Sequence, residues 1–504
     1  MTFSLRTFSQ SCSAVATVAA AGVASASPLD GLSLVIGKVV SGRIQASAAP
    51  KSDSQAMPGM QHGDHPAAAA PQHEGHGQMD GMEGMGHSMS SMQGQFGPWS
   101  MTREGSGTSW LPDAAPMFMK DLPKIGRYDA MVMGLFTLNY TDAGGKRGDQ
   151  QVYSNSMPML MLRRQTQGTT LGLRIMASLD PLLNGEYGAP NLFQTGETAY
   201  GEPLRDRQHP HDLVSELAFT ASRSIGGPNR GYVYLAPVGE PALGGSMFFM
   251  RPSGMEIPEA PIGHHWFDST HISFGVATAG VSLGDRVKVE GSYFNGREPD
   301  ENRYAFDPIR LNSGAARVSY NPTRRLSFNV AYGFLDEPEP ATEPGVSQRR
   351  TTASAAYSSD LSNGDSLNLA LIYGRNGYTG GQKATSALAL EGTLYHGPTS
   401  LFARYEFTDK NEIEDVPSGV YPIHKLLLGA TRNFASRGGL DFGYGGYVGV
   451  YGFPSSLDPF YGKTPVTFGL FLRIRPGRMN HGAMNGAGDK KDDDGMKGMP
   501  GMGG

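Results

Sequence analysis

The segment VTFGLFLRIR, residues 466–475, decides the fold class of this chain. Apolar residues occupy every second position from Val466 to Ile474, and the positions between them include Arg473 and Arg475. Successive side chains of a β-strand point to opposite faces, so a period of two separates an apolar face from a polar one. A sheet with one apolar and one charged face suits a barrel wall between lipid and a wet interior.

The same alternation recurs between about residue 127 and residue 475. Leu326, Phe328 and Val330 share one face of a segment whose other face carries Ser327 and Asn329. We can place about 16 such strands, within a range of 14–18, each roughly ten residues long or longer, which matches a tilted bilayer crossing. The sequence therefore predicts an all-β fold, a transmembrane outer-membrane antiparallel barrel over residues 121–476.

The connections between these strands alternate in length. Short ones fall at residues 284–285, 321–324, 363–364, 396–398 and 436–438. Long ones fall near residues 181–210, 239–268, 297–310, 336–348, 409–423 and 453–463. Short periplasmic turns and long external loops are typical of outer-membrane barrels, whereas a soluble sandwich has no reason for this parity. An even number of strands would place both termini in the periplasm.

The N-terminus has the features of a secretory signal. Arg6 supplies a positive charge, an apolar stretch follows, and Ala24-Ser25-Ala26 forms a cleavage motif. We therefore expect a signal peptide over residues 1–26, with a second possible cleavage site after Ala48. The single cysteine, Cys12, lies within this segment, so the mature chain would have no thiol for disulfides, nucleophiles or metal ligands.

Low-complexity segments flank the predicted barrel. Residues 27–120 and 477–504 are rich in Met, Gly and small or polar residues, and we expect both to be disordered. The net charge of −5 is mild for 504 residues, and no basic patch stands out, so nucleic acid is not an expected partner.

The N-terminal low-complexity segment carries interleaved methionines and histidines. Thioether sulfur is a soft ligand suited to Cu(I), and imidazole binds Cu(II), Cu(I) or Zn(II), so a flexible segment with both can hold copper in either redox state. A plain linker is the alternative, although exposed Met is prone to oxidation. The candidate ligands are Met57, Met60, His62, His65, His73, His76, Met79, Met82, Met85, His87, Met89 and Met92.

A second group of candidate ligands lies in the two longest loops. The first loop ends in His209, His211 and Asp212, and the next holds Met247, Met250 and Met255, followed by His264, His265, Asp268 and His271. The two loops flank one hairpin on the same side, so their side chains can meet. Histidine with carboxylate suits Zn(II) or Cu(II). The alternative is that these residues fix the loops through hydrogen bonds.

Charged residues also occur within the predicted strands. A charge facing lipid would cost about 2–4 kcal/mol at the bilayer midplane, so most of these residues should face the interior. They are Arg163, Arg164, Arg174, Glu216, Lys288, Glu290, Arg317, Arg404, Glu406, Arg473 and Arg475. Their mixed signs leave both an open pore and a plugged barrel possible.

The tail and the predicted barrel together resemble the outer-membrane copper-resistance protein B family. The resemblance rests on the run HEGHGQMDGM, residues 73–82, and its neighbours, and it covers about the first fifth of the chain. It implies copper tolerance at the outer membrane. The barrel region is longer than in that family, and the His-Pro-His-Asp sequence at residues 209–212 is not a motif of it.

The leading hypothesis is a barrel in the outer membrane of a Gram-negative bacterium that binds copper and helps sequester or export it. Its expected partners are outer-membrane lipid and a periplasmic copper protein such as a multicopper oxidase. The alternative is a general or substrate-specific porin with an incidental metal-binding tail. We do not expect an enzyme, because the sequence contains no nucleophile elbow, His-Glu-x-x-His pair or phosphate-binding glycine loop; a barrel-embedded hydrolase is the third hypothesis.

Overall fold

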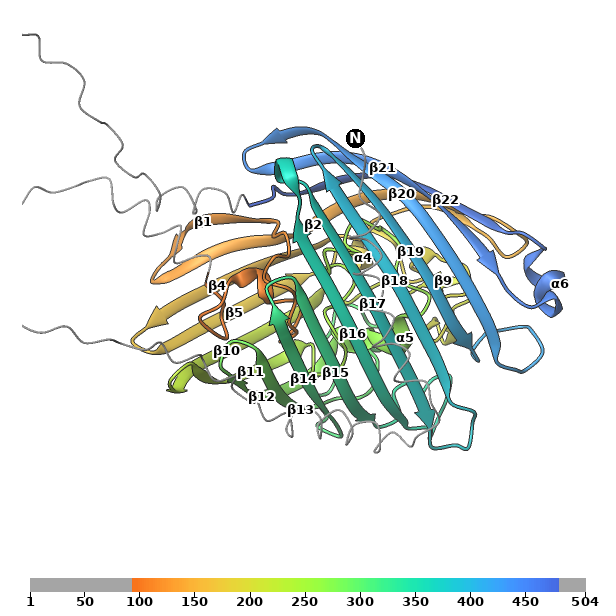
Figure 1. The fold of residues 1–504 in the computed structure, drawn as a ribbon. Coiled ribbons are helices and arrows are strands. Elements are labelled where there is room, and N and C mark those ends of the chain that lie inside the picture. Colours follow the sequence, from red (N-terminus) through yellow and green to blue (C-terminus); the bar gives the residue numbers. More distant parts are fainter. Residues whose placement is uncertain (1–92, 480–504) are drawn as a thin grey trace, which may run out of the picture. The chain divides into compact units, whose positions relative to one another are not determined.

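The computed structural model describes residues 93–479. The expected signal peptide and most of the expected low-complexity tails lie outside these residues. Within them, long antiparallel strands form one closed sheet (Figure 1). No helix of this part of the chain is long and apolar enough to cross a membrane.

The sheet closes into a barrel of 16 strands, as the sequence predicted. The first full-length strand, β2 (Tyr128–Ala143), pairs with the last, β22 (Val466–Pro476), and also with β4 (Met157–Thr166). Two short strands, β1 (Met119–Ile125) and β3 (Gln150–Tyr153), pair with the remaining ends of β2. The other strands of the barrel are β5 (Thr169–Ala177), β10 (Val214–Gly226), β11 (Asn229–Gly239), β12 (Ser273–Leu283), β13 (Val287–Phe294), β14 (Ser313–Thr323), β15 (Leu326–Leu335), β16 (Gln348–Asp360), β17 (Ser366–Tyr378), β18 (Thr385–His396), β19 (Thr399–Lys410), β20 (Tyr421–Arg437) and β21 (Leu440–Gly452).

Short turns and long loops alternate around the barrel. One end carries connections of two to five residues, such as those between β4 and β5 and between β20 and β21. The other end carries the long loops 178–213, 240–272, 295–312, 336–347, 411–420 and 453–465. This parity was predicted, and it defines a short-turn end, where β2 begins and β22 ends, and a long-loop end.

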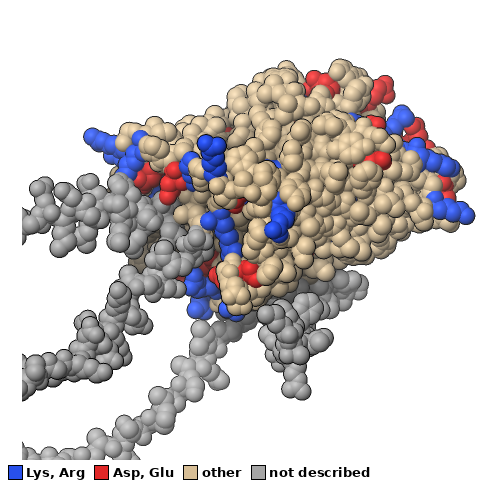
Figure 2. Space-filling model, turned by 90° about the horizontal axis from the view of Figure 1, so that it is seen from above, with Lys and Arg blue, Asp and Glu red and all other residues tan. Residues whose placement is uncertain are grey.

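The two faces of the wall differ as the alternation predicted. In β22, Val466, Phe468, Leu470 and Leu472 are exposed on the outside, and the residues between them are buried. The charged strand residues named above are buried in the interior, except Arg164, which is only half-buried. In the view of Figure 2, most charged side chains lie toward the ends of the molecule, beside a broad surface with few charges. Such an outer surface matches lipid.

Residues 93–118 are folded inside the barrel, near the short-turn end. Arg174 of β5 donates to the Gly107 carbonyl at 2.6 Å, and Arg317 of β14 donates to Thr108 Oγ1 at 2.8 Å. The segment contains a short 3-10 helix, η1 (Met101–Arg103). Arginines of the barrel wall thus donate hydrogen bonds to a backbone and a side-chain acceptor of residues 93–118.

This order corrects the expected boundary at residue 120. Residues 93–118 were assigned to a disordered segment because of the low-complexity composition of residues 27–120. The reason for the difference is tertiary: Phe96, Trp99 and Trp110 pack with lumen residues such as Tyr232 and Tyr234, burial that a chain in isolation cannot achieve.

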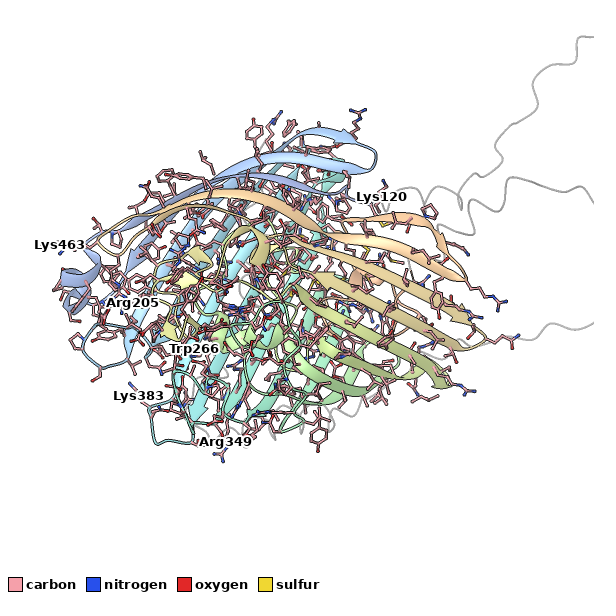
Figure 3. The ribbon with its side chains drawn as sticks, turned by 180° about the vertical axis from the view of Figure 1, so that it is seen from behind. Lys120, Arg205, Trp266, Arg349, Lys383 and Lys463 are labelled. Carbon is pink, nitrogen blue, oxygen red and sulfur yellow. The ribbon has the colours of Figure 1, made fainter. Side chains whose placement is uncertain are left out.

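The two longest loops also fold into the interior, from the long-loop end. Loop 240–272 reaches deep enough for Glu256 to pair with Arg473 and Arg475 of β22. Its Glu259 pairs with Lys425 of β20. In Figure 3, Trp266 lies inside the barrel, whereas Lys383 and Lys463 lie at its rim. Short helical turns occur in and near the loops: α4 (Asp180–Leu183), α5 (His264–Phe267), η2 (Ser269–His271), η3 (Ser362–Gly364), η4 (Ser455–Leu457) and α6 (Asp458–Tyr461).

Candidate functional site

The structure divides the predicted ligands into two sets. The twelve tail residues from Met57 to Met92 all lie outside the described residues, so their metal-binding role stays a prediction. The seven loop residues are described, and all of them are buried in the barrel interior.

Four of the loop histidines come together, as the placement of the two loops predicted. The ring centre of His271 lies 5.1 Å from that of His211 and 5.0 Å from that of His264. His209 joins the group, with its ring centre 5.4 Å from His211 and 6.2 Å from His264. The rings are close, but among the described residues no three of these histidines have ligand nitrogens that all lie within 4.8 Å of one another. We call His209, His211, His264 and His271 the histidine cluster.

Three rings of the cluster use Nδ1 for a hydrogen bond, which leaves their Nε2 atoms available. His211 donates from Nδ1 to Asp180 Oδ2 at 2.7 Å, and His264 donates from Nδ1 to Asp268 Oδ1 at 2.6 Å. His271 donates from Nδ1 to the Asp268 carbonyl at 2.8 Å. Because these acceptors fix the proton on Nδ1, the lone pair of each ring lies on Nε2, which is the arrangement found around metal-binding histidines.

Two of these three Nε2 atoms have no other partner in the described part of the chain. The Nε2 atoms of His211 and His271 are buried and have no hydrogen-bond partner in the described part of the chain. An unpaired buried polar atom costs about 1–3 kcal/mol, so such atoms call for an explanation. Burial lowers the pKa of His264, and it lowers the pKa of His271 well below its usual range. Both rings are therefore neutral near pH 7, the form that binds a metal.

The other predicted loop residues are engaged differently. Asp212 pairs with Arg303 at 3.6 Å, and burial raises the pKa of Asp212 to about 7. His209 Nε2 lies 2.7 Å from Glu197 Oε1. His265 points away from its neighbour His264 in α5, toward Glu298 and Glu339. The seven residues therefore serve more than one site.

Methionines line an interior pocket next to the histidine cluster. The pocket has a volume of about 50 Å³ and is lined by Met117, Met133, Met157, Met159, Met176, Met247, Met250 and Met255, with Phe249 among the other lining residues. We call it the methionine pocket. The Phe249 ring centre lies 6.2 Å from that of His211, and the Phe248 ring centre lies 5.9 Å from that of His264. Two adjacent phenylalanines thus connect the pocket to the cluster.

Strand methionines of this pocket were missed by the sequence analysis, although a signal for them exists. Met157 and Met159 share a strand face with Arg163, which could not face lipid. Met176 shares a face with Arg174 in the next strand. The parity of the charged residues therefore identifies these methionines as interior. No sequence pattern marked Asp180 as the hydrogen-bond acceptor of His211, because only the tertiary fold brings these two residues together.

No protein-family model matches the chain, and no curated protein matches it. Among solved structures, the anion-selective porin from Comamonas acidovorans is 11% identical, with 69% of this chain and 99% of the porin covered and a TM-score of 0.43. OmpF of Salmonella typhi in complex with daunomycin is 11% identical, with 71% and 100% covered and a TM-score of 0.44. The outer membrane channel DcaP of Acinetobacter baumannii is 10% identical, with 70% and 99% covered and a TM-score of 0.42.

These similarities concern the class of outer-membrane, porin-like barrels. The identities and TM-scores are too low to transfer a function, and none of the matches supports the finer resemblance to copper-resistance protein B. That resemblance stays a prediction.

Proposed function

We propose that this protein is an outer-membrane barrel that binds copper in its interior and contributes to copper tolerance by sequestering or exporting the ion. The observation that carries the proposal is the methionine pocket beside the histidine cluster. Thioethers prefer Cu(I), and imidazoles accept both Cu(I) and Cu(II), so the pair suits an ion that changes oxidation state.

The pocket has the chemistry expected for a soft ion. Interior faces of transmembrane barrels are usually polar, whereas eight methionines line this one pocket. Leucine would fill the same volume without a ligand atom, so hydrophobic packing alone does not call for sulfur. Thr102, Glu104 and Arg475 are the polar residues of the lining.

The size of the pocket favours an ion over a larger solute. A porin conducts through a water-filled lumen, but here residues 93–118 and loops 178–213 and 240–272 occupy the interior. A volume of about 50 Å³ has room for an ion or a few water molecules rather than a nutrient. The porin alternative would require these segments to move aside.

The N-terminal tail would supply the ion. Residues 93–118 follow the Met/His-rich tail directly in sequence, and they contribute Met117 to the pocket. Tethered ligands raise the local concentration of an ion near the pocket. If the short-turn end faces the periplasm, as in other barrels of this class, copper would enter there and move toward the histidine cluster.

The test is anaerobic Cu(I) titration of the purified full-length protein against a chromogenic Cu(I) chelator. The variant Met159→Leu/Met176→Leu removes two thioethers from the pocket and should lose about one tightly bound Cu(I) per chain. The control Met131→Leu/Met161→Leu changes two methionines of the same buried cluster that do not line the pocket. Each swap should cost less than about 1.5 kcal/mol of stability. Equal Cu(I) binding by both variants and the wild type would overturn the proposal.

The contribution of the tail is tested separately in cells. A full-length chain in which the methionines and histidines of residues 57–92 become Leu and Gln keeps the tail length but removes its ligands. We expect reduced growth in copper and normal growth without it. Unchanged copper tolerance would eliminate the capture role of the tail and leave the interior site to be judged by the Cu(I) titration.

A further inference from the structure

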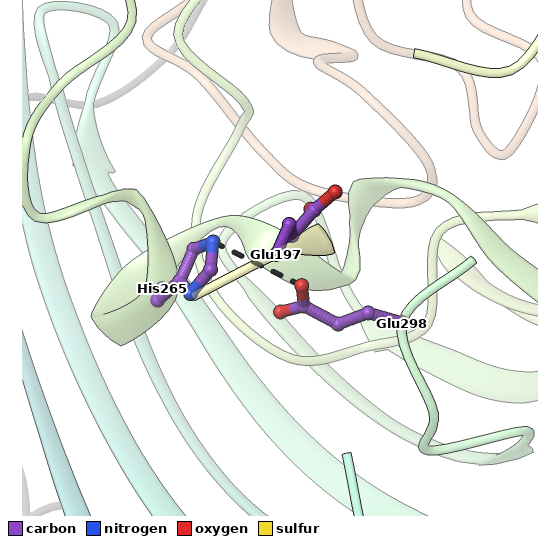
Figure 4. Close-up of side chains that lie close together, drawn as sticks. All are labelled: Glu197, His265 and Glu298. Carbon is purple, nitrogen blue, oxygen red and sulfur yellow. Dashed lines mark ion pairs between the residues drawn. The ribbon is translucent and has the colours of Figure 1, made fainter. Parts of the chain in front are cut away.

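Five long loops bring one histidine and four glutamates together at the long-loop end of the barrel. His265 comes from α5 in loop 240–272, and Glu197, Glu298, Glu339 and Glu412 each come from a different loop. Ligand atoms of Glu197, His265 and Glu298 all lie within 4.8 Å of one another (Figure 4). Those of His265, Glu339 and Glu412 also lie within 4.8 Å of one another. His265 belongs to both groups. We call these five residues the His265 site.

The imidazole of His265 is buried, and its two nitrogens make no hydrogen bond within the described residues. Its side chain is 1% exposed, and neither ring nitrogen has a hydrogen-bond partner in the described residues. Nε2 lies 3.8 Å from Glu298 Oε2, and Nδ1 lies 3.6 Å from Glu339 Oε1, distances too long for hydrogen bonds. One ion can bind only one nitrogen of an imidazole, so an ion between Nε2 and Glu298 would use Nε2 and leave the proton on Nδ1, which faces Glu339.

The backbone at Gly196 lies so close to the His265 imidazole that no side chain fits between them. Gly196 has a φ of +108°, and a Cβ at this position would lie 2.2 Å from His265 Cε1. Only glycine adopts this conformation readily, and any side chain would collide with the imidazole. Glycine at position 196 therefore allows the loop that carries Glu197 to pass directly beside the His265 ring.

The charge around the ring is only partly balanced by protein cations. Arg303 donates to Glu197 at 3.0 Å, and Arg350 and Lys410 attract Glu339 and Glu412. Without a further cation, the ionised carboxylates therefore destabilise one another.

The site has access from outside the barrel. Glu197, Glu298 and Glu339 line a pocket of about 590 Å³, which also contains Asp300 and Glu301. This pocket is much larger than the methionine pocket, and its lining carries six carboxylates, including Asp307, against three arginines, Arg297, Arg303 and Arg310. An acidic mouth attracts cations to the ligands beneath it.

We propose that the His265 site binds a divalent metal ion of the Zn²⁺ or Mn²⁺ type, held by imidazole and carboxylates. The ligand set is oxygen-rich and lacks sulfur, so it disfavours Cu(I). It is therefore a second metal site, chemically different from the methionine pocket. The inference does not depend on the copper proposal, because no residue of the methionine pocket belongs to it.

The test is Mn²⁺ titration of the purified full-length protein, in which free Mn²⁺ is measured by EPR. Thioethers bind Mn²⁺ poorly, so the probe reports oxygen-rich sites. The variants His265→Gln and Glu298→Gln, which lie on different loops, should each bind one Mn²⁺ fewer per chain than the wild type. Gly196→Ala, which displaces the ring, should act in the same direction. The control Glu301→Gln changes a carboxylate of the same pocket outside the site and should bind as the wild type.

Two results would overturn this inference. The first is equal Mn²⁺ binding by the wild type, His265→Gln and Glu298→Gln when their thermal unfolding is also equal. The second is release of the bound Mn²⁺ by Cu(I) but not by Zn²⁺, since Zn²⁺ should displace Mn²⁺ from an imidazole–carboxylate site. Loss of Cu(I) binding in the methionine variants would leave both outcomes unaffected, so the two proposals fail independently.

Discussion

Glu197 Oε1 lies 2.7 Å from His209 Nε2, and this contact links the histidine cluster to the His265 site. Burial alone would raise the pKa of Glu197, but His209 and Arg303 outweigh it and lower the pKa. The residue therefore stays ionised between the two clusters. Neighbouring side chains connect the methionine pocket to the larger acidic pocket. Phe249 lies beside His211, His211 lies beside His209, and His209 contacts Glu197, which lines the acidic pocket. Ligand hardness increases along this connection, from sulfur to nitrogen to oxygen.

The central ring of the histidine cluster should be required for Cu(II) binding. In His271→Ala, the ring that lies about equally far from His211 and His264 is lost. We expect nitrogen hyperfine coupling in the Cu(II) EPR spectrum of the full-length protein to weaken. His396→Ala is the control, because His396 is 73% exposed at a turn. Identical spectra for wild type and His271→Ala would show that copper does not bind at this ring.

The carboxylate behind His211 should tune metal affinity without contacting the ion. Asp180→Asn removes the negative acceptor of His211 Nδ1 and can leave the proton on the nitrogen needed for the metal. Second-shell changes of this kind typically reduce affinity about 10–100-fold. Competition titration with Cu(II) measures the change. Asp365→Asn removes a similar bond to the exposed His396 and should leave the affinity unaltered.

Arg317 should stabilise the wall, the interior segment and the loop together. Its guanidinium donates to Glu290 at 2.8 Å, to Thr108 at 2.8 Å and to the Gly244 carbonyl at 2.9 Å. Arg317→Met leaves Glu290 without its main partner in a buried setting, which should cost about 3–5 kcal/mol.

Denaturant unfolding in detergent measures this cost. Hydrogen exchange should also increase in residues 93–118, which Arg317 helps to hold. Arg286→Met removes an exposed charge in the turn between β12 and β13, beside β14, and should change stability by less than about 0.5 kcal/mol. A similar small effect of Arg317→Met would contradict the assigned role.

Loop 240–272 should limit ion flow through the barrel. Glu256 and Glu259 pair with lumen cations on β20 and β22. Glu256→Gln/Glu259→Gln weakens this attachment, so we expect higher and noisier conductance in planar bilayers than in the wild type. Glu301→Gln serves as the control. A wild type that already conducts like a wide water-filled pore would favour the porin alternative.

Much of the fold followed from local pattern. The alternation in residues 466–475 and its repetition predicted strands, faces and a barrel of 16 strands, because side-chain direction in a strand depends only on sequence position. The lengths of the connections predicted the two ends. The same reasoning placed Arg174, Glu290 and Arg317 in the interior, since a charge facing lipid is costly.

The interior contents did not follow from such patterns. Residues 93–118 have no strand periodicity, and their order depends on aromatic burial and on donors from distant strands such as Arg174 and Arg317. The meeting of His209, His211, His264 and His271 was predicted from loop placement, but Asp180 was not.

The sequence by itself thus determined the wall: which segments cross, which faces meet lipid, and which loops are long enough to fold inward. The tertiary structure alone decided the sites, because Glu197, His265, Glu298, Glu339 and Glu412 lie on five loops and become neighbours only when the barrel closes. Periodicity is a local property of the chain, whereas contact between distant loops depends on the closure of the whole sheet.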